Sequence, residues 1–570
     1  HFVVVPRLSF SDTEEHSCCY SPSQDLDVTF AFNMESLAQK SRFQVAYTLG
    51  IIATLACPIT QGANILVVPV DRSHWVNMRI LVEELKLHGH TITVFYFSSS
   101  FYIKERPDLY QSIAVERPGS LRKNTSEQAV SHFVQNVIDT LQNGWTTWVI
   151  VKFQYAKMYF AQTCNNLIRE LIIAIYENKK LLKQLESAHF DLVLTDPAIP
   201  TGSMLAYSLK LPLVYNVRWL NSGDAHFHFA PSPPSYVPIS GSRLTDKMSF
   251  LQRTQNVILN LLSLLISKFL TNPMYNELCH RYLGPDTDIE TILLRADVWL
   301  MRVDFIFEFP RPTMPNIVYI GGFQCKPSKP LAAEFEEFVQ SSGEHGIIVM
   351  SLGTFVSSLP MQITMKIAEA FAQVPQKVIW RHDGKIPPNL GNNTLLAKWI
   401  PQNDLLGHPK IRAFVAHGGI NGVYEAIYHG VPVVGIPLFY DQFDNLHRLE
   451  TRGAAKVINV AAMQSTELLQ ALNEVINNTS YRDNMQKLSA LHRDQPESPM
   501  ERAIFWIEYV ARHKGAAHLR SESYRLPWYV YYCVDVMFFV LNVLLKVATL
   551  TVLLLKKLCN IAGGKKQKTQ

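Results

Sequence analysis

The sequence predicts an α/β fold: two Rossmann-like, doubly wound domains facing across a cleft, followed by one C-terminal transmembrane helix. Three observations lead to this prediction. Apolar, strand-like runs alternate with helical patterns from residue 63, and a second series of the same kind starts near His345. Residues 536–555 then form an apolar stretch long enough to cross a bilayer as a helix. The length of 570 residues also exceeds what one hydrophobic core supports.

The first domain is expected over residues 63–324. Residues 63–70 (ANILVVPV) form a near-continuous apolar run, which is typical of a parallel strand buried on both faces. A helical pattern over 75–87 and a second strand over 91–97 complete a βαβ unit. A further strand over 191–195 ends at Asp196, and residues 225–290 are mostly helical.

The second domain is expected over residues 343–515, with a C-terminal helix that packs back. Strand patterns cover 346–351, 377–380, 395–399, 412–416 and 431–436, and helices lie between them. The proline-rich stretch CKPSKPL predicts a hinge linker over 325–342. Ligands of such sheets bind at the carboxyl ends of the strands.

Both ends of the chain carry targeting patterns. Basic residues precede an apolar run at 43–57 and small residues follow it, which predicts a signal peptide over 34–62, with a short core helix as the alternative. We have no physical account of the extension 1–33. At the other end, an aromatic juxtamembrane segment (516–535) and a lysine-rich tail (556–570) flank the span, which favours a cytosolic tail.

Composition excludes some functions. The net charge of +5 is mild, and no basic patch interleaved with aromatic residues predicts a nucleic-acid partner. No CxxC spacing occurs, and His226 and His228 have no third candidate ligand nearby, so no metal site is expected. The pattern leaves open whether the chain forms homo- or hetero-oligomers.

Residues 399–442 contain the most informative pattern. The strand over 412–416 leads into His417-Gly418-Gly419, and a helix follows from about Asn421. A glycine turn at a helix N-terminus is an anion site that suits a diphosphate. Trp399 offers a flat face for a base, and the loop after the next strand carries Asp441 and Gln442, which can bond sugar hydroxyls.

A second candidate pair lies in the first domain. His74 and Asp196 both follow predicted strands, and a histidine oriented by a carboxylate is suited to act as a general base near neutral pH. The alternatives are that His74 caps a helix and that Asp196-Pro197 forms only a turn.

The stretch WIPQNDLLGHP…AHGGINGVYEAIYHGVPVVGIPLFYDQFDN resembles the signature of the UDP-glucuronosyltransferases, which have the GT-B fold. Residues 351–354, 380–384, 305–312 and 502–510 also resemble family motifs, as does the anchor with its lysine tail. Lysines three and five residues from the C-terminus resemble an endoplasmic-reticulum retrieval signal. The departures are Phe443, where the family usually has proline, and Thr354, where serine is common.

The resemblance implies a role for each matching residue. His74 would be the catalytic base and Asp196 its partner, and the first domain would bind the acceptor. The donor-binding residues would be Ser351, Trp399, Gln402, His417, Gly419, Asn421, Gly422, Glu425, Asp441, Gln442 and Arg302. Trp399 would stack on uracil, Glu425 would bond the ribose, and Arg302 would contact the sugar carboxylate.

The resemblance further implies inverting transfer of glucuronic acid from UDP-glucuronic acid, as co-substrate and without another cofactor, to a hydroxyl or amine of a small lipophilic acceptor. The targeting patterns at the two ends together imply a single-pass type I protein of the endoplasmic-reticulum membrane with a lumenal body, and the sequons at Asn124, Asn392, Asn477 and Asn478 are compatible with this. Two alternatives stay open at this point: transfer of another UDP-hexose, and an inactive family member that acts as a membrane-bound partner.

Overall fold

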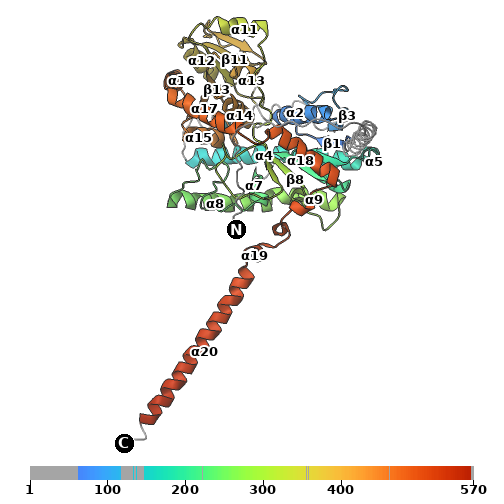
Figure 1. The fold of residues 1–570 in the computed structure, drawn as a ribbon, viewed down its shortest axis with the longest axis vertical. Coiled ribbons are helices and arrows are strands. Elements are labelled where there is room, and N and C mark those ends of the chain that lie inside the picture. The colour runs from blue at the N-terminus through green and yellow to red at the C-terminus, as the bar shows by residue number, and fades with distance from the viewer. Residues whose placement is uncertain are drawn as a thin grey trace, which may run out of the picture. The chain divides into compact units, whose positions relative to one another are not determined.

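The computed structural model describes residues 62–116, 133, 136–137, 147–220, 223–354, 356, 359–460 and 462–566. The extension 1–33, the predicted signal peptide apart from Gly62, and residues 567–570 of the predicted tail lie outside the described residues. Two parallel sheets with their helices form the described body, and α20 follows near the C-terminus (Figure 1).

The first sheet has seven parallel strands in the order β3-β2-β1-β4-β5-β8-β9. Their bounds are β1 Asn64–Val68, β2 Thr91–Phe97, β3 Gln111–Val115, β4 Leu192–Thr195, β5 Leu213–Val217, β8 Val298–Met301 and β9 Ile317–Tyr319. In β1, Ile65 and Val67 enter one core while Leu66 and Val68 enter another. Both faces of the sheet are therefore covered, which explains why this strand reads as a continuous apolar run.

The second sheet has six parallel strands in the order β12-β11-β10-β13-β14-β15. Their bounds are β10 Ile347–Ser351, β11 Lys377–Arg381, β12 Thr394–Ala397, β13 Ile411–Ala416, β14 Val433–Gly435 and β15 Ala455–Val457. The predicted strands are present with slightly different ends. The chain order reverses between β10 and β13 here and between β1 and β4 in the first sheet, and these switch points are where doubly wound folds bind ligands.

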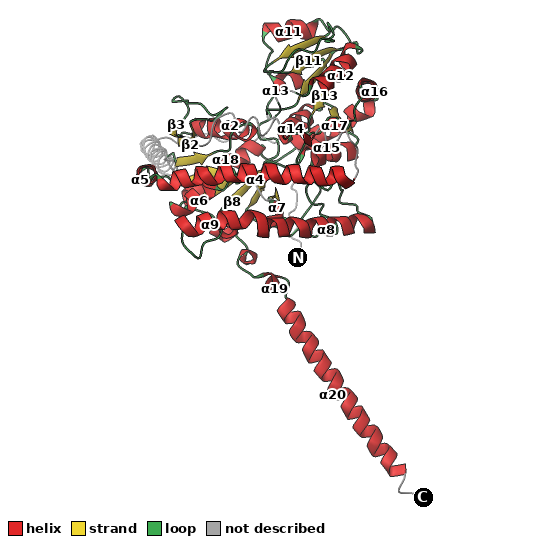
Figure 2. Ribbon diagram, turned by 180° about the vertical axis from the view of Figure 1, so that it is seen from behind, coloured by secondary structure: helices red, strands yellow, loops and turns green. Residues whose placement is uncertain are grey.

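Helices cover the two sheets, as Figure 2 shows in red. Those before β8 are α2 Ser73–Leu87, α4 Thr147–Glu177, α5 Lys179–Ser187, α6 Thr201–Ser208, α7 His226–Phe229, α8 Phe250–Ile266, α9 Asn272–Tyr282 and α10 Ile289–Leu294, with a π-helical turn η1 at Ser267–Thr271. Those that follow are α11 Ala333–Gln340, α12 Met361–Ala372, α13 Gln402–Leu406, α14 Ile420–His429, α15 Gln442–Thr451, α16 Ser465–Asn477, α17 Thr479–Arg493, α18 Pro499–His513, α19 Trp528–Tyr531 and α20 Val534–Lys566. A short ribbon pairs β6 Trp219–Leu220 with β7 Gly223–Asp224, and 3₁₀ turns cover Ala517–Leu519 and Glu522–Tyr524.

Two predicted boundaries differ from the structure. The expected linker 325–342 contains α11, whose Val339 is buried in the main core, so only its first part lacks regular structure. The predicted span 536–555 and residues 556–566 of the predicted tail form one helix, because α20 runs without interruption to Lys566. Periodicity alone did not mark the end of this helix, since lysines are good helix formers.

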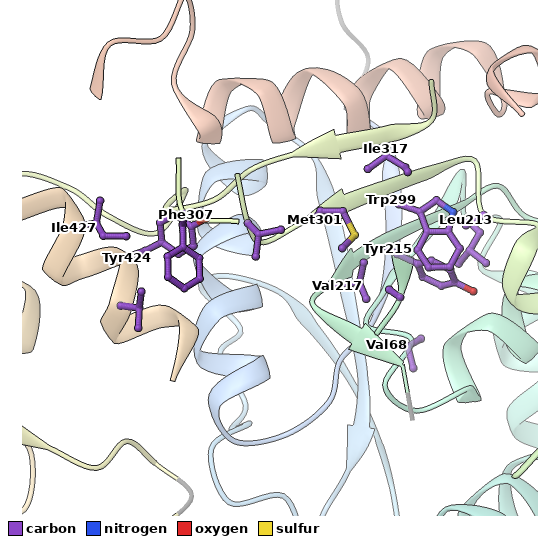
Figure 3. Packing of buried hydrophobic residues seen from close by; sticks show 14 of the residues in the cluster. Val68, Leu213, Tyr215, Val217, Trp299, Met301, Phe307, Ile317, Tyr424 and Ile427 are labelled. Carbon is purple, nitrogen blue, oxygen red and sulfur yellow. The ribbon is translucent and has the colours of Figure 1, made fainter. Parts of the chain in front are cut away.

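The two α/β halves share a core. One cluster of buried residues contains Tyr215 and Trp299 of the first half together with Tyr424 and Ile427 of α14, and Phe307 of the first half packs against Tyr424 (Figure 3). Helix α18 belongs to the second half in sequence but packs on the first sheet, where Ile504 and Ile507 join its core. The chain therefore returns to the first half after completing the second.

Candidate active site

The switch point of the first sheet brings His74 and Asp196 together. His74 lies in the first turn of α2, after β1, and Asp196 directly follows β4. Because β1 and β4 are parallel neighbours, both residues leave the same edge of the sheet, and His74 Nδ1 is 2.6 Å from Asp196 Oδ2. The side chain of His74 is 16% exposed and that of Asp196 only 1%. A ligand can therefore reach the imidazole but not the carboxylate.

The charge on Asp196 determines which nitrogen of His74 can accept a proton from a ligand. Burial would raise the pKa of Asp196, but the attraction and hydrogen bond of His74 and the charge of Arg302 outweigh it and lower that pKa. An ionised carboxylate only accepts hydrogen bonds. His74 Nδ1 therefore carries the proton in this pair, and Nε2 is the atom that can accept a proton from a ligand.

Arg302 lies against this pair. Its Nη2 donates to Asp196 Oδ2 at 3.2 Å and is 3.4 Å from His74 Nδ1. Its side chain is 5% exposed, and it adds a fixed positive charge beside the buried carboxylate. The predicted contact of Arg302 with a sugar carboxylate stays a prediction. Its contact with Asp196 was not predicted.

The switch point of the second sheet ends in a glycine turn. Strand β13 ends at Ala416, Gly418 has a φ of +86°, and Gly419 is the N-cap of α14. Glycine adopts this backbone conformation without strain. The turn places the unpaired N–H groups and the positive end of the α14 dipole next to Ser351, the register neighbour of Ala416 at the end of β10. This arrangement suits a diphosphate.

Two glycines make room for His417. A Cβ at Gly353 would lie 2.7 Å from the imidazole, and one at Gly419 would lie 2.5 Å from it. Burial lowers the pKa of His417 to about 4. The ring is therefore neutral near pH 7, so any bond it makes to a ligand comes from a neutral imidazole.

Trp399, Gln402 and Glu425 provide a flat surface and polar groups next to this turn. The predicted strand 395–399 ends at Trp399, but β12 ends at Ala397, so Trp399 follows the strand. Its side chain is 58% exposed. The guanidinium of Arg381 lies 5.3 Å from its ring centroid. Gln402 Nε2 donates to Glu425 Oε2 at 2.5 Å, and burial raises the pKa of Glu425 to about 7. A Cβ at Gly422 would lie 3.4 Å from Gln402 Nε2.

Asn445 links Asp441 to the glycine turn, because its Nδ2 bonds both Asp441 Oδ2 at 2.8 Å and the Gly418 carbonyl at 2.9 Å. The Oε1 atom of Gln442 accepts from the backbone N–H groups of Leu438 and Phe439 at 2.9 and 3.2 Å. Only Nε2 of Gln442 can therefore serve a ligand.

Two residues that the sequence analysis did not single out connect the halves at this site. Asn77 of α2 donates to Asn421 Oδ1 at 3.3 Å and accepts from Arg302 Nη1 at 3.4 Å. Arg218, after β5, donates to Asn445 at 3.1 Å, and its Nε lies 3.8 Å from Asp441 Oδ2. A polar residue three positions after His74 on α2 was the only sequence signal for Asn77. Arg218 had none, since its partners in the second half, Asn445 and Asp441, are more than 200 residues away in the chain.

The His74–Asp196 pair and the predicted donor residues of the second half therefore lie at two switch points that the Asn77–Asn421 hydrogen bond joins. No group of three or more His, Cys, Asp or Glu side chains that could hold a metal ion lies in the described part of the chain.

Residues 63–569 match the family described as UDP-glucoronosyl and UDP-glucosyl transferase. The chain belongs to this family. It is 43% identical to mouse UDP-glucuronosyltransferase 2A2 over 90% of this chain and 96% of that protein. It is 44% identical to rat UDP-glucuronosyltransferase 2B1 over 86% of this chain and 93% of that protein.

Solved structures agree with this family assignment at the level of the fold. Spinosyn forosaminyltransferase SpnP aligns with a TM-score of 0.52 at 15% identity over 79% of this chain and 99% of that chain. A variant of Os79 from O. sativa, in complex with UDP, aligns with a TM-score of 0.52 at 16% identity over 78% of this chain and 100% of that chain. The predicted GT-B fold is confirmed, and this UDP-glucoronosyl and UDP-glucosyl transferase family member carries its candidate site at the two switch points.

The raised pKa of Glu425 predicts a pH-dependent affinity for the nucleotide sugar. If ribose hydroxyls bond Glu425, protonation near pH 7 replaces a charged acceptor by a weaker neutral one, so binding of UDP-glucuronic acid should weaken by about fivefold as the pH falls from about 8 to about 6. His417 stays neutral over this range and should not contribute. Calorimetry with Glu425→Gln should give a lower affinity without this pH dependence. An unchanged dependence in the variant would exclude Glu425 as its source.

Proposed function

We propose that the protein transfers glucuronic acid from UDP-glucuronic acid to a hydroxyl or amine of small lipophilic acceptors, and releases UDP and a β-glucuronide. The observation that carries this proposal is the His74–Asp196 pair, placed in contact with the donor helix α14 through Arg302, Asn77 and Asn421. Membership of the family and the names of the relatives, UDP-glucuronosyltransferases, support the donor sugar. UDP-glucuronic acid acts as co-substrate, and no other cofactor takes part.

The proposed reaction is a single displacement. Nε2 of His74 takes the proton of the acceptor hydroxyl while the acceptor oxygen attacks the anomeric carbon from the face opposite the diphosphate. The bond from the anomeric carbon to the diphosphate oxygen breaks, and its electrons leave with UDP. Attack from the opposite face inverts the anomeric centre. Asp196 stabilises the imidazolium that forms on His74.

The second half holds the donor in this proposal. Trp399 stacks on the uracil, Gln402 bonds the ribose or the base, and Glu425 bonds the ribose hydroxyls. The backbone from Gly419 to Gly422, with Ser351, His417 and Asn421, holds the diphosphate at the start of α14. The positive end of this helix also stabilises the charge on departing UDP. Asp441 and Gln442 bond the sugar hydroxyls, and Arg302 contacts the sugar carboxylate.

We further propose that α20 anchors the protein in the endoplasmic-reticulum membrane with the body in the lumen. Within residues 534–561, an 18-residue window has a mean hydropathy of 2.3, and none of this window is buried against the protein. Aromatic residues before the helix and lysines at its end support a cytosolic C-terminus.

The base mechanism predicts a specific pattern of losses. His74→Ala should lower kcat with a phenol acceptor by about 10²–10⁴-fold and leave UDP affinity unchanged, because the residues proposed to hold the UDP part of the donor lie in the other half. Asp196→Asn should be nearly as damaging, and the double variant should be little worse than His74→Ala because the two residues act as one unit. Amine acceptors, which are nucleophilic when neutral, should depend less on His74.

Several UDP-sugars should be compared in the same assay to define the donor. Near-normal kcat in His74→Ala, or losses that multiply fully in the double variant, would contradict the pair mechanism. Faster turnover with UDP-glucose than with UDP-glucuronic acid would leave the mechanism intact but overturn the proposed sugar.

The proposed orientation can be tested in sealed microsomes. A protease added outside should remove only epitopes in residues 556–570 and leave the body intact, because the bilayer shields the lumen. Digestion of the body before the membranes are opened with detergent would show that the orientation is wrong.

A further inference from the structure

Helix α8 and the turn η1 after it present apolar side chains to the outside of the body. The large apolar residues exposed there are Phe250, Leu251, Val257, Ile258, Leu261, Leu262, Leu264, Leu265, Ile266, Phe269 and Leu270. Most are more than half exposed, including Leu261 at 56%. A contiguous apolar surface of this length is unusual on a protein surrounded by water.

The inner side of α8 is polar instead. Asn256 is fully buried, and its Oδ1 accepts from the N–H of Ile239 at 2.8 Å while its Nδ2 donates to the carbonyls of Pro234 and Val237 at 2.9 and 2.8 Å. Ser267 in η1 is also buried. A helix on the surface of a soluble protein buries its apolar side and exposes its polar side. Helix α8 does the reverse.

The exposed apolar surface is too broad for one partner helix. At about 100° per residue, its apolar positions span roughly 200° of the circumference, whereas a helix–helix seam is a narrower stripe. No charged residue occurs from Thr254 to Ser267, and Arg253 and Lys268 stand at the two ends. This distribution fits an apolar medium bounded by polar headgroups.

The position of α20 indicates that this apolar medium is a lipid bilayer. Helix α20 is long and apolar enough to cross a membrane. The segment leading to it is fixed to the body near α10 and β9, because Arg520 bonds the carbonyl of Arg295 at 3.1 Å and Tyr524 bonds Asn316 at 3.2 Å. Helix α10 packs on α9, which continues from α8 through η1. Figures 1 and 2 both show α8, α9 and α19 at one end of the body. A bilayer that holds α20 therefore lies near α8.

We propose that α8 and η1 form a second membrane contact, in which α8 lies in the plane of the lipid interface with Leu261 and its exposed neighbours inserted among the acyl chains. The helix does not cross the bilayer, although residues 250–282 are apolar enough by composition. The hydrogen bonds of Asn256 fix the middle of α8 to the body, and Leu278 and Cys279 of α9 are completely buried in the protein core. This proposal rests on the proposed anchoring by α20.

Photo-crosslinking of the full chain tests this contact. Benzoylphenylalanine is placed at Leu261, at Leu544 in α20, or at Leu491 in α17, which have similar exposures of 56%, 59% and 59%. Each chain is reconstituted into vesicles of phosphatidylcholine with a minority of phosphatidylserine, irradiated, and analysed for lipid adducts by mass spectrometry. The probes at Leu261 and Leu544 should give lipid adducts and the probe at Leu491 should not.

A second variant distinguishes loss of the lipid contact from loss of the fold. Ile258→Asp and Leu265→Asp flank the probe at Leu261 on the exposed side, so they should reduce its lipid adducts severalfold while UDP affinity and the adducts of the Leu544 probe stay unchanged. Adducts at Leu544 with none at Leu261, or crosslinks from Leu261 to a second protein chain, would overturn the α8 contact and leave the anchor standing. Absence of adducts at Leu544 would overturn the anchor and the α8 contact together.

Discussion

A series of buried hydrogen bonds through Asn77 joins the two halves of the candidate site. Asp196 accepts from Arg302, Arg302 donates to Asn77, and Asn77 donates to Asn421 near the start of α14. Asn77 is 1% exposed, and an unsatisfied buried polar group costs about 1–3 kcal/mol. The side-chain oxygen of Asn77 finds donors within the first half, but its Nδ2 reaches Asn421 only when the two halves meet. The positions of the proposed base and of the diphosphate site consequently depend on each other.

Other buried contacts hold the halves in this relation. Asp304 of the first half bonds the hydroxyl of Tyr424 at 3.1 Å and His492 Nδ1 at 2.9 Å. Gly321 lies against Tyr424 so closely that a Cβ there would be 2.5 Å from its hydroxyl oxygen. The buried Glu308 of the first half likewise pairs with Arg448 of α15 at 3.0 Å. Displacing one partner of such a contact leaves the other partner buried and uncompensated, which destabilises the protein. These contacts therefore favour one arrangement of the halves.

The sequence predicted the parts of the site that depend on local order. Strand, glycine turn and helix follow one another at residues 411–429, so the position of Gly418 and Gly419 at a helix N-terminus could be read directly. His74 and Asp196 were paired because both follow strands, and the parallel pairing of β1 and β4 places them together. Family resemblance, not spacing, supplied the roles of Gln402, Glu425 and Arg302.

What the sequence did not predict depends on contacts between distant segments. The link from Asn77 to Asn421 joins residues 344 positions apart, and neither helix pattern distinguishes it from an ordinary polar position. The contact of Arg302 with Asp196 was missed for the same reason. The reversed polarity of α8 was also missed, because the sequence pattern of an apolar helix is the same whether its apolar side faces a core or the outside.

A double-mutant cycle measures whether Asn77 couples the proposed base in one half to the proposed donor helix in the other. The kcat of Asn77→Ala, of Asn421→Ala and of the double variant would be measured with UDP-glucuronic acid and a phenol, alongside UDP affinity. The account predicts that Asn77→Ala lowers kcat more than it weakens UDP binding, and that the double variant is less impaired than the product of the two single losses. Single losses that multiply fully, or an Asn77→Ala enzyme with normal kcat, would contradict it.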